Sequence, residues 1–294
     1  MRWFALLLLL PACATRRAQP PVAALSPLQA WAQHCEDWDE WERPGPPAPI
    51  FGNTYYVGTC GISALLVRGE DGLVLLDTGT RAGADLVADN IERLGFDVAD
   101  IELILISHEH FDHVGGVAEL QRRSGARVLA APRAAEVLRS GQSANDDPQH
   151  GVLQDFEPVP VVGELSDGER VSAAGIEFVP TFTPGHTPGA VSWSWTSCEG
   201  DTCVDIVYAD SLSPISSEDY RFREHPEALA AYRAGLTRLA DLRCELLLTP
   251  HPSASAMRER FANNAPLAPP HCSEYAASIH ARLDARLAEE AAAE

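Results

Sequence analysis

The densest group of reactive side chains lies at residues 107–113, which read Ser-His-Glu-His-Phe-Asp-His. They directly follow the apolar run 101–106, which has the length and composition of a strand buried on both faces. Imidazoles and carboxylates at the end of a buried strand are costly unless they bind something. Both are good zinc ligands, and the chain has only 10 histidines in all. The cluster predicts a metal centre built from His108, His110, Asp112 and His113.

Two other histidines have a similar context. His186 lies in a proline- and glycine-rich turn at 183–189, and His251 follows the apolar run 246–248. Either alone would more often be a surface or core histidine, but together with the first cluster they complete two sets of metal ligands. Asp77 also ends a strand-like run. It is either a turn residue or an outer carboxylate that orients a ligand histidine.

The segments that must position these residues alternate between strand-like and helix-like patterns. Strand-like runs occur at 54–57, 62–67, 73–76, 101–106, 127–130, 177–180, 190–195, 204–208 and 245–248. Helical spacing occurs at 85–94, 116–123, 226–242 and in the alanine-rich tail from residue 275. Prolines at 43–49 exclude a helix or a central strand there. With no short repeat and no linker after residue 50, we expect one domain that mixes sheet and helix.

Composition narrows the possible partners. The chain has 294 residues, which is long enough for a sizeable core. Its formal net charge is −20. An acidic protein repels phosphate backbones, which argues against a nucleic-acid partner.

The N-terminus is typical of an export signal. A positive residue precedes a short apolar run and then small residues, so residues 1–14 are predicted to be removed and 15–30 to form a tether. The apolar run is too short to span a membrane. Two alternatives remain open: cleavage near Ala14, or a lipoprotein in which Cys13 carries the lipid and is the only link to the membrane. Either alternative places the protein in the periplasm.

The cysteine count agrees with export. Without Cys13, six cysteines remain: Cys35, Cys60, Cys198, Cys203, Cys244 and Cys272. An oxidising compartment allows all six to form disulfides, although six cysteines permit 15 pairings. Cys198 and Cys203 flank a turn-like insert and are the easiest pair to join. None lies in a C-x-x-C zinc pattern.

The order of these motifs resembles the metallo-β-lactamase superfamily over residues 55–272. The resemblance rests on His-x-His-x-Asp-His, on Leu-Asp-Thr-Gly before it, and on isolated Gly-His and Pro-His motifs after it. Three segments are similar to the third subclass of class B β-lactamases. They are Gly-Asn-Thr-Tyr-Tyr-Val-Gly at 52–58, Tyr-Ala-Asp-Ser-Leu-Ser at 208–213 and Leu-Thr-Pro-His-Pro at 248–252.

This resemblance implies an α+β fold, a four-layer αββα sandwich spanning residues 31–294 as one catalytic domain. The metals would lie at one edge, between the two sheets. The resemblance implies two zinc ions per chain, the first held by His108, His110 and His186, and the second by Asp112, His113 and His251. It also places a disulfide between Cys244 and Cys272.

The implied reaction is hydrolysis of the amide bond of β-lactam antibiotics, which gives resistance. A hydroxide bridging the two zincs would attack the lactam carbonyl, with Asp112 orienting it and helping to protonate the leaving nitrogen. Ser211 and Ser213 would contact the substrate, and Asp77 would be an outer residue. The partner is a small molecule, and we expect a monomer.

Two alternatives compete with this hypothesis. A lactonase or a glyoxalase II-like thioesterase shares the fold but places an aspartate between the metals, and Asp210 is one residue from Ser211. If Asp210 faces the metals, those enzymes become credible; if Ser211 does, the β-lactamase hypothesis holds. A non-catalytic zinc-binding protein would be expected to lack ligands, whereas all six are present.

Overall fold

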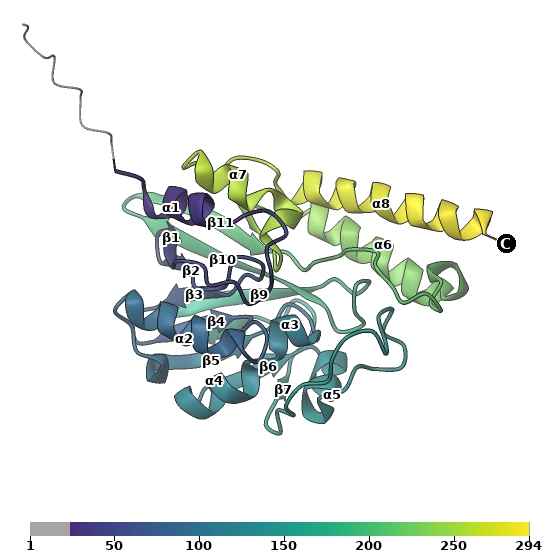
Figure 1. Cartoon of the computed structure of the whole chain (residues 1–294), viewed down its shortest axis with the longest axis horizontal. Coiled ribbons are helices and arrows are strands. Elements are labelled where there is room, and N and C mark those ends of the chain that lie inside the picture. Colours follow the sequence, from purple (N-terminus) through teal and green to yellow (C-terminus); the bar gives the residue numbers. More distant parts are fainter. Residues whose placement is uncertain (1–23, 294) are drawn as a thin grey trace, which may run out of the picture.

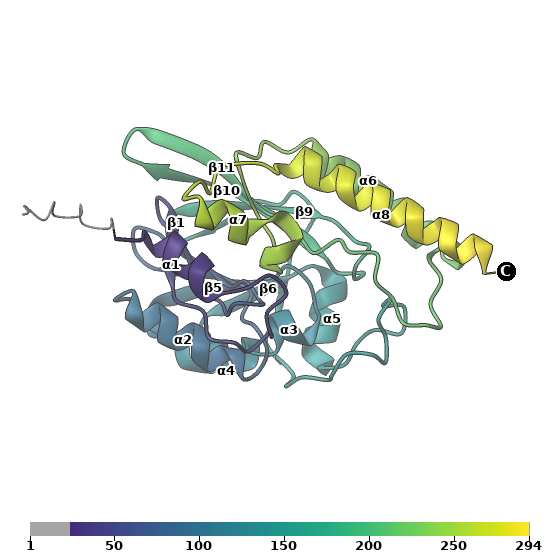
Figure 2. The same ribbon diagram turned by 45° about the horizontal axis from the view of Figure 1, so that its top comes forward.

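Two β-sheets pack face to face between two layers of helices in the computed structural model, which describes residues 24–293 (Figure 1). Strand order is β1-β2-β3-β4-β5-β6-β7 in the first sheet and β12-β11-β10-β9-β8 in the second. Helices α2, α4 and α5 lie outside the first sheet, and α6, α7 and α8 lie outside the second (Figures 1 and 2). The expected αββα sandwich is confirmed.

The strands are β1 (Ala48–Phe51), β2 (Thr54–Tyr56), β3 (Leu65–Arg68), β4 (Leu73–Leu76), β5 (Ile101–Leu105), β6 (Arg127–Ala130), β7 (Gly163–Glu164), β8 (Val171–Ala173), β9 (Ile176–Phe182), β10 (Val191–Glu199), β11 (Thr202–Tyr208) and β12 (Leu246–Leu248). The helices are α1 (Pro27–His34), α2 (Gly83–Arg93), α3 (Phe111–Val114), α4 (Val117–Ser124), α5 (Pro132–Ser140), α6 (Pro226–Ala240), α7 (Met257–Ala262) and α8 (Cys272–Ala292).

The apolar runs form the centre of the sandwich. Strands β4, β5 and β6 pair in parallel, and every residue of β4 is buried. Burial on both faces explains why β4 is continuously apolar, whereas β5 and β6 are apolar except at the exposed Glu102 and Arg127. Large side chains such as Trp193, Phe178 and Tyr56 fill the space between the sheets. The Trp193 indole N–H donates to the carbonyl of Ile106 at 2.7 Å, which ties the second sheet to the end of β5.

Several elements differ from the expectation. The tether was expected to reach residue 30, but α1 begins at Pro27 because Ser26 and Gln29 form a capping box. Helix α5 was not predicted; it begins with a proline and ends at Gly141 in the left-handed conformation. The prolines of 43–49 do allow β1, because this strand lies at the edge of its sheet.

Three disulfides cross-link the chain: Cys35–Cys60, Cys198–Cys203 and Cys244–Cys272. Cys198 and Cys203 are directly opposite in the β10–β11 hairpin, which extends beyond the sandwich in Figure 2. The proposed export signal, Cys13 and most of the tether lie outside the described residues. Among those that are described, no helix is long and apolar enough to cross a membrane.

Candidate metal centre

The ligand candidates come together where strands of both sheets end. His108 and His110 follow β5, and the short helix α3 carries Asp112 and His113. His186 lies in the turn between β9 and β10, and His251 lies just after β12. The turn before His186 needs glycine at Gly185, because the ring of Tyr232 packs directly against its α-carbon. The six candidate ligands, which are far apart in the sequence, thus lie together at one edge of the sandwich.

His108, His110 and His186 form the first ligand set. Their ring centroids stand at the corners of a nearly equilateral triangle with sides of 5.0, 4.9 and 4.9 Å. One ligand atom from each lies within 4.8 Å of the others, and all three residues are buried. Three imidazoles directed at one point form a donor set that suits a transition metal such as zinc.

Asp112, His113 and His251 form the second ligand set, which is more compact. Asp112 Oδ2 lies 3.0 Å from His113 Nε2 and 3.5 Å from His251 Nε2, and the two imidazole nitrogens are 3.3 Å apart. Ligands about 2.0–2.1 Å from a tetrahedral zinc stand roughly 3.3 Å from one another. The second set therefore has the spacing that a zinc ion requires.

Each histidine of the first set is held by its other ring nitrogen. His108 Nδ1 lies 2.8 Å from Asp210 Oδ1, and His110 Nε2 lies 3.0 Å from Asp147 Oδ2. His186 Nδ1 lies 2.9 Å from the carbonyl oxygen of Ser213. Outer partners of this kind fix the orientation of ligand histidines in metalloproteins. They leave His108 Nε2 buried and without a hydrogen-bond partner among residues 24–293, as expected for an atom reserved for a metal.

Asp77 lies behind the second set. Its Oδ2 is 3.5 Å from His113 Nδ1 and accepts from the Tyr208 hydroxyl at 2.7 Å. The same carboxylate accepts from the backbone and side chain of Ser107, both at 2.7 Å. Asp77 has a left-handed backbone with φ +58°, which aspartate tolerates better than most residues. The conformation aims its carboxylate at the loop that carries four ligands.

Glu109 joins the two loops of the first set. It is buried, and it accepts from the Thr187 hydroxyl at 2.7 Å and from the Gly189 backbone N–H at 2.9 Å. Burial raises the pKa of Glu109 to about 7. The Gln149 amide nitrogen is 3.5 Å from His186 Nε2, so an amide also lies beside the metal-facing nitrogen.

Burial and charge set the protonation of the ligands. Burial lowers the pKa of His186 to about 3 and that of His251 to about 4, so both are neutral and able to bind metal at pH 7. Burial would also lower the pKa of His113, but the carboxylates of Asp112 and Asp77 outweigh it and raise that pKa to about 10. The pKa of Asp112 lies well below its usual range, because His113 outweighs the effect of burial.

The two candidate substrate residues differ. The Ser211 hydroxyl is buried and lacks a hydrogen-bond partner within the described part of the chain. The Ser213 carbonyl oxygen accepts a hydrogen bond from His186 Nδ1 at 2.9 Å, and the Ser213 hydroxyl lies 3.5 Å from the Ser211 carbonyl. Sequence reasoning did not single out Asp147, Glu109 or Gln149. Only the position of Glu109 between two ligands could have marked it; nothing local distinguishes Asp147.

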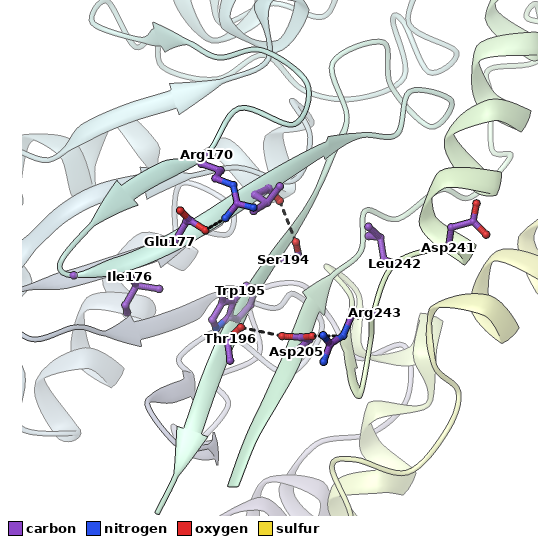
Figure 3. A pocket seen from close by; sticks show the side chains of 12 residues that line it. Arg170, Ile176, Glu177, Ser194, Trp195, Thr196, Asp205, Asp241, Leu242 and Arg243 are labelled. Atoms are coloured by element: carbon purple, nitrogen blue, oxygen red, sulfur yellow. Dashed lines mark hydrogen bonds and ion pairs between the residues drawn. The ribbon is translucent and has the colours of Figure 1, made fainter. Parts of the chain in front are cut away.

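A second depression, with a volume of about 550 Å³, lies on the outer face of β9, β10 and β11, near the end of α6 (Figure 3). Its two charged pairs are Arg170 with Glu177, and Arg243 with Asp205. Their guanidinium groups are largely exposed. This depression contains none of the candidate ligands, so the proposed metal chemistry is confined to the candidate metal centre.

Comparison with known proteins agrees with the fold and the convergent ligands. Residues 57–251 match the Metallo-beta-lactamase superfamily, and the chain belongs to this superfamily. Among solved structures it is similar to the MIM-2 metallo-β-lactamase, with 54% identity and a TM-score of 0.85, covering 90% of this chain and 98% of that one.

Two further solved structures are similar to the chain. MIM-1 from Novosphingobium pentaromativorans is 46% identical, with a TM-score of 0.86 and coverage of 90% and 98%. MEM-A1, a subclass B3 metallo-β-lactamase from a soil metagenome library, is 40% identical, with a TM-score of 0.83 and coverage of 87% and 100%. The predicted resemblance to the third subclass is confirmed by such neighbours.

A hydroxyacylglutathione hydrolase of Pseudomonas aeruginosa is 30% identical over 168 residues, 54% of this chain and 55% of that protein. The chain thus spans about half the length of the curated relatives it matches.

Proposed function

We propose that the chain is a dizinc hydrolase that opens the amide ring of β-lactam antibiotics. His108, His110 and His186 would hold the first zinc, and Asp112, His113 and His251 the second. The observation that carries the proposal is the convergence of two sets of candidate ligands, His108/His110/His186 and Asp112/His113/His251, in a fold shared with metallo-β-lactamases of 39–54% identity.

Zinc bound at these ligands lowers the pKa of water to about 7 and polarises a carbonyl oxygen. The protein's own part is to orient the reactants. The Asp112 carboxylate is ionised at neutral pH, so it can accept a hydrogen bond from the attacking water. A carboxylate in this position can then pass a proton to the amide nitrogen as the ring opens. The outer partners of His108, His110 and His186 keep these ligands in a fixed orientation during the reaction.

Ser211 and Ser213 are our candidates for contacts with the carboxylate of the substrate. The chain contains no lysine, so no side-chain ammonium group can bind the substrate carboxylate. Serine hydroxyls are instead the proposed short-range donors to it. The buried, unpartnered hydroxyl of Ser211 supports this role, since a buried hydroxyl is costly unless it finds a partner.

Thioester hydrolysis is the alternative supported by the hydroxyacylglutathione hydrolases. In that alternative Asp210 would bridge the metals. However, Asp210 Oδ1 lies against the outer nitrogen of His108, and its Oδ2 accepts from the Leu212 backbone N–H at 3.1 Å. This position of the carboxylate, against the outer nitrogen of a candidate ligand, favours the β-lactamase proposal. An aspartate at this position then acts as an outer partner of a ligand.

The proposal extends to location and assembly. Residues 1–14 would direct export to the periplasm, where the three disulfides are stable, and the enzyme would act as a monomer on a small molecule. Mass spectrometry of the mature N-terminus distinguishes cleavage near Ala14 from a lipid on Cys13. An intact N-terminus would contradict export by either route.

Hydrolysis of a chromogenic cephalosporin tests the function directly. The purified protein should turn the substrate over, lose activity with a chelator and regain it with zinc. A folded, zinc-loaded protein that leaves the cephalosporin intact but cleaves thioesters or lactones would overturn the proposal.

A further inference from the structure

The segment 211–225, between β11 and α6, forms one wall of the metal centre but has little regular structure. Its only regular element is the 3₁₀ helix Phe222–Glu224. It contacts two ligand loops: the Ser213 carbonyl meets His186, and the Ser217 backbone N–H donates to the Pro148 carbonyl at 2.8 Å. The exact course of this segment therefore decides where Ser211 and Ser213 stand beside the metals.

Apolar packing holds only part of this segment, because Leu212 and Phe222 are buried against α6 and α8 while other parts border open space. A cavity of about 300 Å³ lies against it, lined by the 146–148 loop, the turn at 184–188, Tyr220, Phe222 and Tyr232. On the other side Ile215 is 51% exposed. A segment with a cavity behind it and solvent in front needs polar anchors to keep one position.

Those anchors come from helix α8, which runs alongside α6 (Figures 1 and 2). Near its start, the Tyr275 hydroxyl donates to the Ser211 carbonyl at 2.6 Å. Near its end, Glu290 accepts from the backbone N–H groups of Phe222 and Arg223, each at 3.1 Å. Arg286 donates from Nε to Glu290 at 3.0 Å and from Nη2 to the Ser216 hydroxyl at 2.9 Å.

The placement of Glu290 is explained only in part by its own helix, in which Arg286, one turn earlier, is its ion-pair partner. It lies in the last turn of α8, where a negative charge is disfavoured by the helix dipole. It is also only 3% exposed, and burying a carboxylate is costly unless it is paired and hydrogen-bonded. Its position is explained by its partners: it caps the 3₁₀ helix of the segment and pairs with Arg286.

We propose that Arg286 and Glu290 form a C-terminal latch, which holds the segment 211–225 against the metal centre and thereby determines substrate affinity. Both are positioning residues, because they act through the serines of the segment. The effect on substrate affinity rests on the proposed β-lactamase function. The mechanical claim, that α8 holds the segment, does not.

The test compares Glu290→Ala and Arg286→Ala with Asp284→Ala. Asp284 is a matched control, since it is an exposed carboxylate of α8 whose partner, Arg233, belongs to α6 and not to the segment. Amide hydrogen exchange in the full-length, zinc-loaded protein should be about tenfold faster at Phe222 and Arg223 in Glu290→Ala, because their charge-assisted acceptor is gone. Asp284→Ala should leave this exchange unchanged.

Kinetics with a chromogenic cephalosporin test the second half of the proposal. In both latch variants KM should rise about threefold to tenfold, with a smaller change in kcat and the full zinc content retained. Glu290→Gln, which keeps an acceptor oxygen, should recover part of the loss. Unchanged exchange at residues 222–223 would overturn the latch, and faster exchange with an unchanged KM would overturn its role in substrate binding. A wild type that exchanges as expected but hydrolyses no β-lactam would contradict the proposed function and leave the mechanical claim supported.

Discussion

The two sets of candidate ligands are held in different ways. Each histidine of the first set has an outer partner, supplied by Asp210, Asp147 or the Ser213 carbonyl. The outer partners of the second set are more distant: Asp77 Oδ2 is 3.5 Å from His113 Nδ1, and the Gly61 carbonyl oxygen is 3.3 Å from Nδ1 of His251, whose side chain is 22% exposed. Its ligands are instead brought together by the attraction between Asp112 and His113.

The first set is therefore preorganised by surrounding residues, whereas the second is held by attraction between its own members. The first set is held open by residues outside it, so its geometry should survive without metal. The second set is compact because a protonated histidine lies beside a carboxylate, and a metal must displace that proton. We therefore expect the first zinc to bind more tightly than the second. Each of the following predictions would break or sharpen this comparison.

The largest effect is expected from the second set. Asp112→Ala removes both a metal ligand and the carboxylate that orients water, so kcat should fall on the order of a thousandfold or more. The fold should survive, as judged by circular dichroism. Asp155→Ala, in the polar loop beyond residue 150, is the control and should retain activity. Full activity in Asp112→Ala would refute the assignment of the site.

An intermediate effect is expected from the outer partners of the first set. Asp147→Asn and Asp210→Asn should lower the affinity for the first zinc ion by about 10- to 100-fold, because the histidines lose a charged partner that fixes their orientation. Competition with a chromogenic chelator measures this. Asp146→Asn is a matched control, since Asp146 is adjacent in sequence but pairs with Arg133 on the surface. An equal loss in Asp146→Asn would mean that the loop, not the Asp147 carboxylate, supports the site.

The smallest effect concerns the stability of the metal-free protein. The folded-state pKa of His113 is about 10, above the value of about 6.5 expected when unfolded. The folded state therefore holds the proton more tightly, and its contribution, full below pH 6.5, is lost as pH rises toward 10. The melting temperature of chelator-treated protein should fall by roughly 5 °C over this range.

A histidine of the first set is not expected to contribute to this pH dependence of the melting temperature. The pKa of His186 is about 3, so this residue is neutral in both states above pH 6.5 and contributes nothing to the change. His113→Ala should remove most of the dependence. A wild-type melting temperature that stays level from pH 6.5 to 10 would contradict the paired state of Asp112 and His113.

The ligands and central strands were predictable because their signals are local. An apolar run followed by histidines marks both a buried strand and a site at its end. Sequence alone could not decide whether Asp77 is a turn residue or an outer carboxylate, because its partners Ser107 and Tyr208 lie 30 and 131 residues away.

Asp147, Arg286 and Glu290 were not predictable for the same reason. Asp147 lies in a polar loop beside Asn145 and Asp146, whose side chains have similar chemistry, and nothing in the sequence shows which one turns inward. Glu290 lies in an ordinary alanine-rich helix with Arg286 one turn before it, and only the packing of α8 against the segment 211–225 brings it to the backbone N–H groups of Phe222 and Arg223. Interactions that depend on two distant segments leave no periodic pattern in either one.

Native mass spectrometry of zinc stoichiometry tests the central claim most directly. The wild type should carry two zinc ions, and His186→Ala and His251→Ala should each carry one at zinc concentrations that saturate the wild type. The ion retained by His251→Ala should be bound more tightly than the one retained by His186→Ala. A wild type that binds a single zinc, or two variants that both keep two, would contradict the assignment of six ligands to two sites.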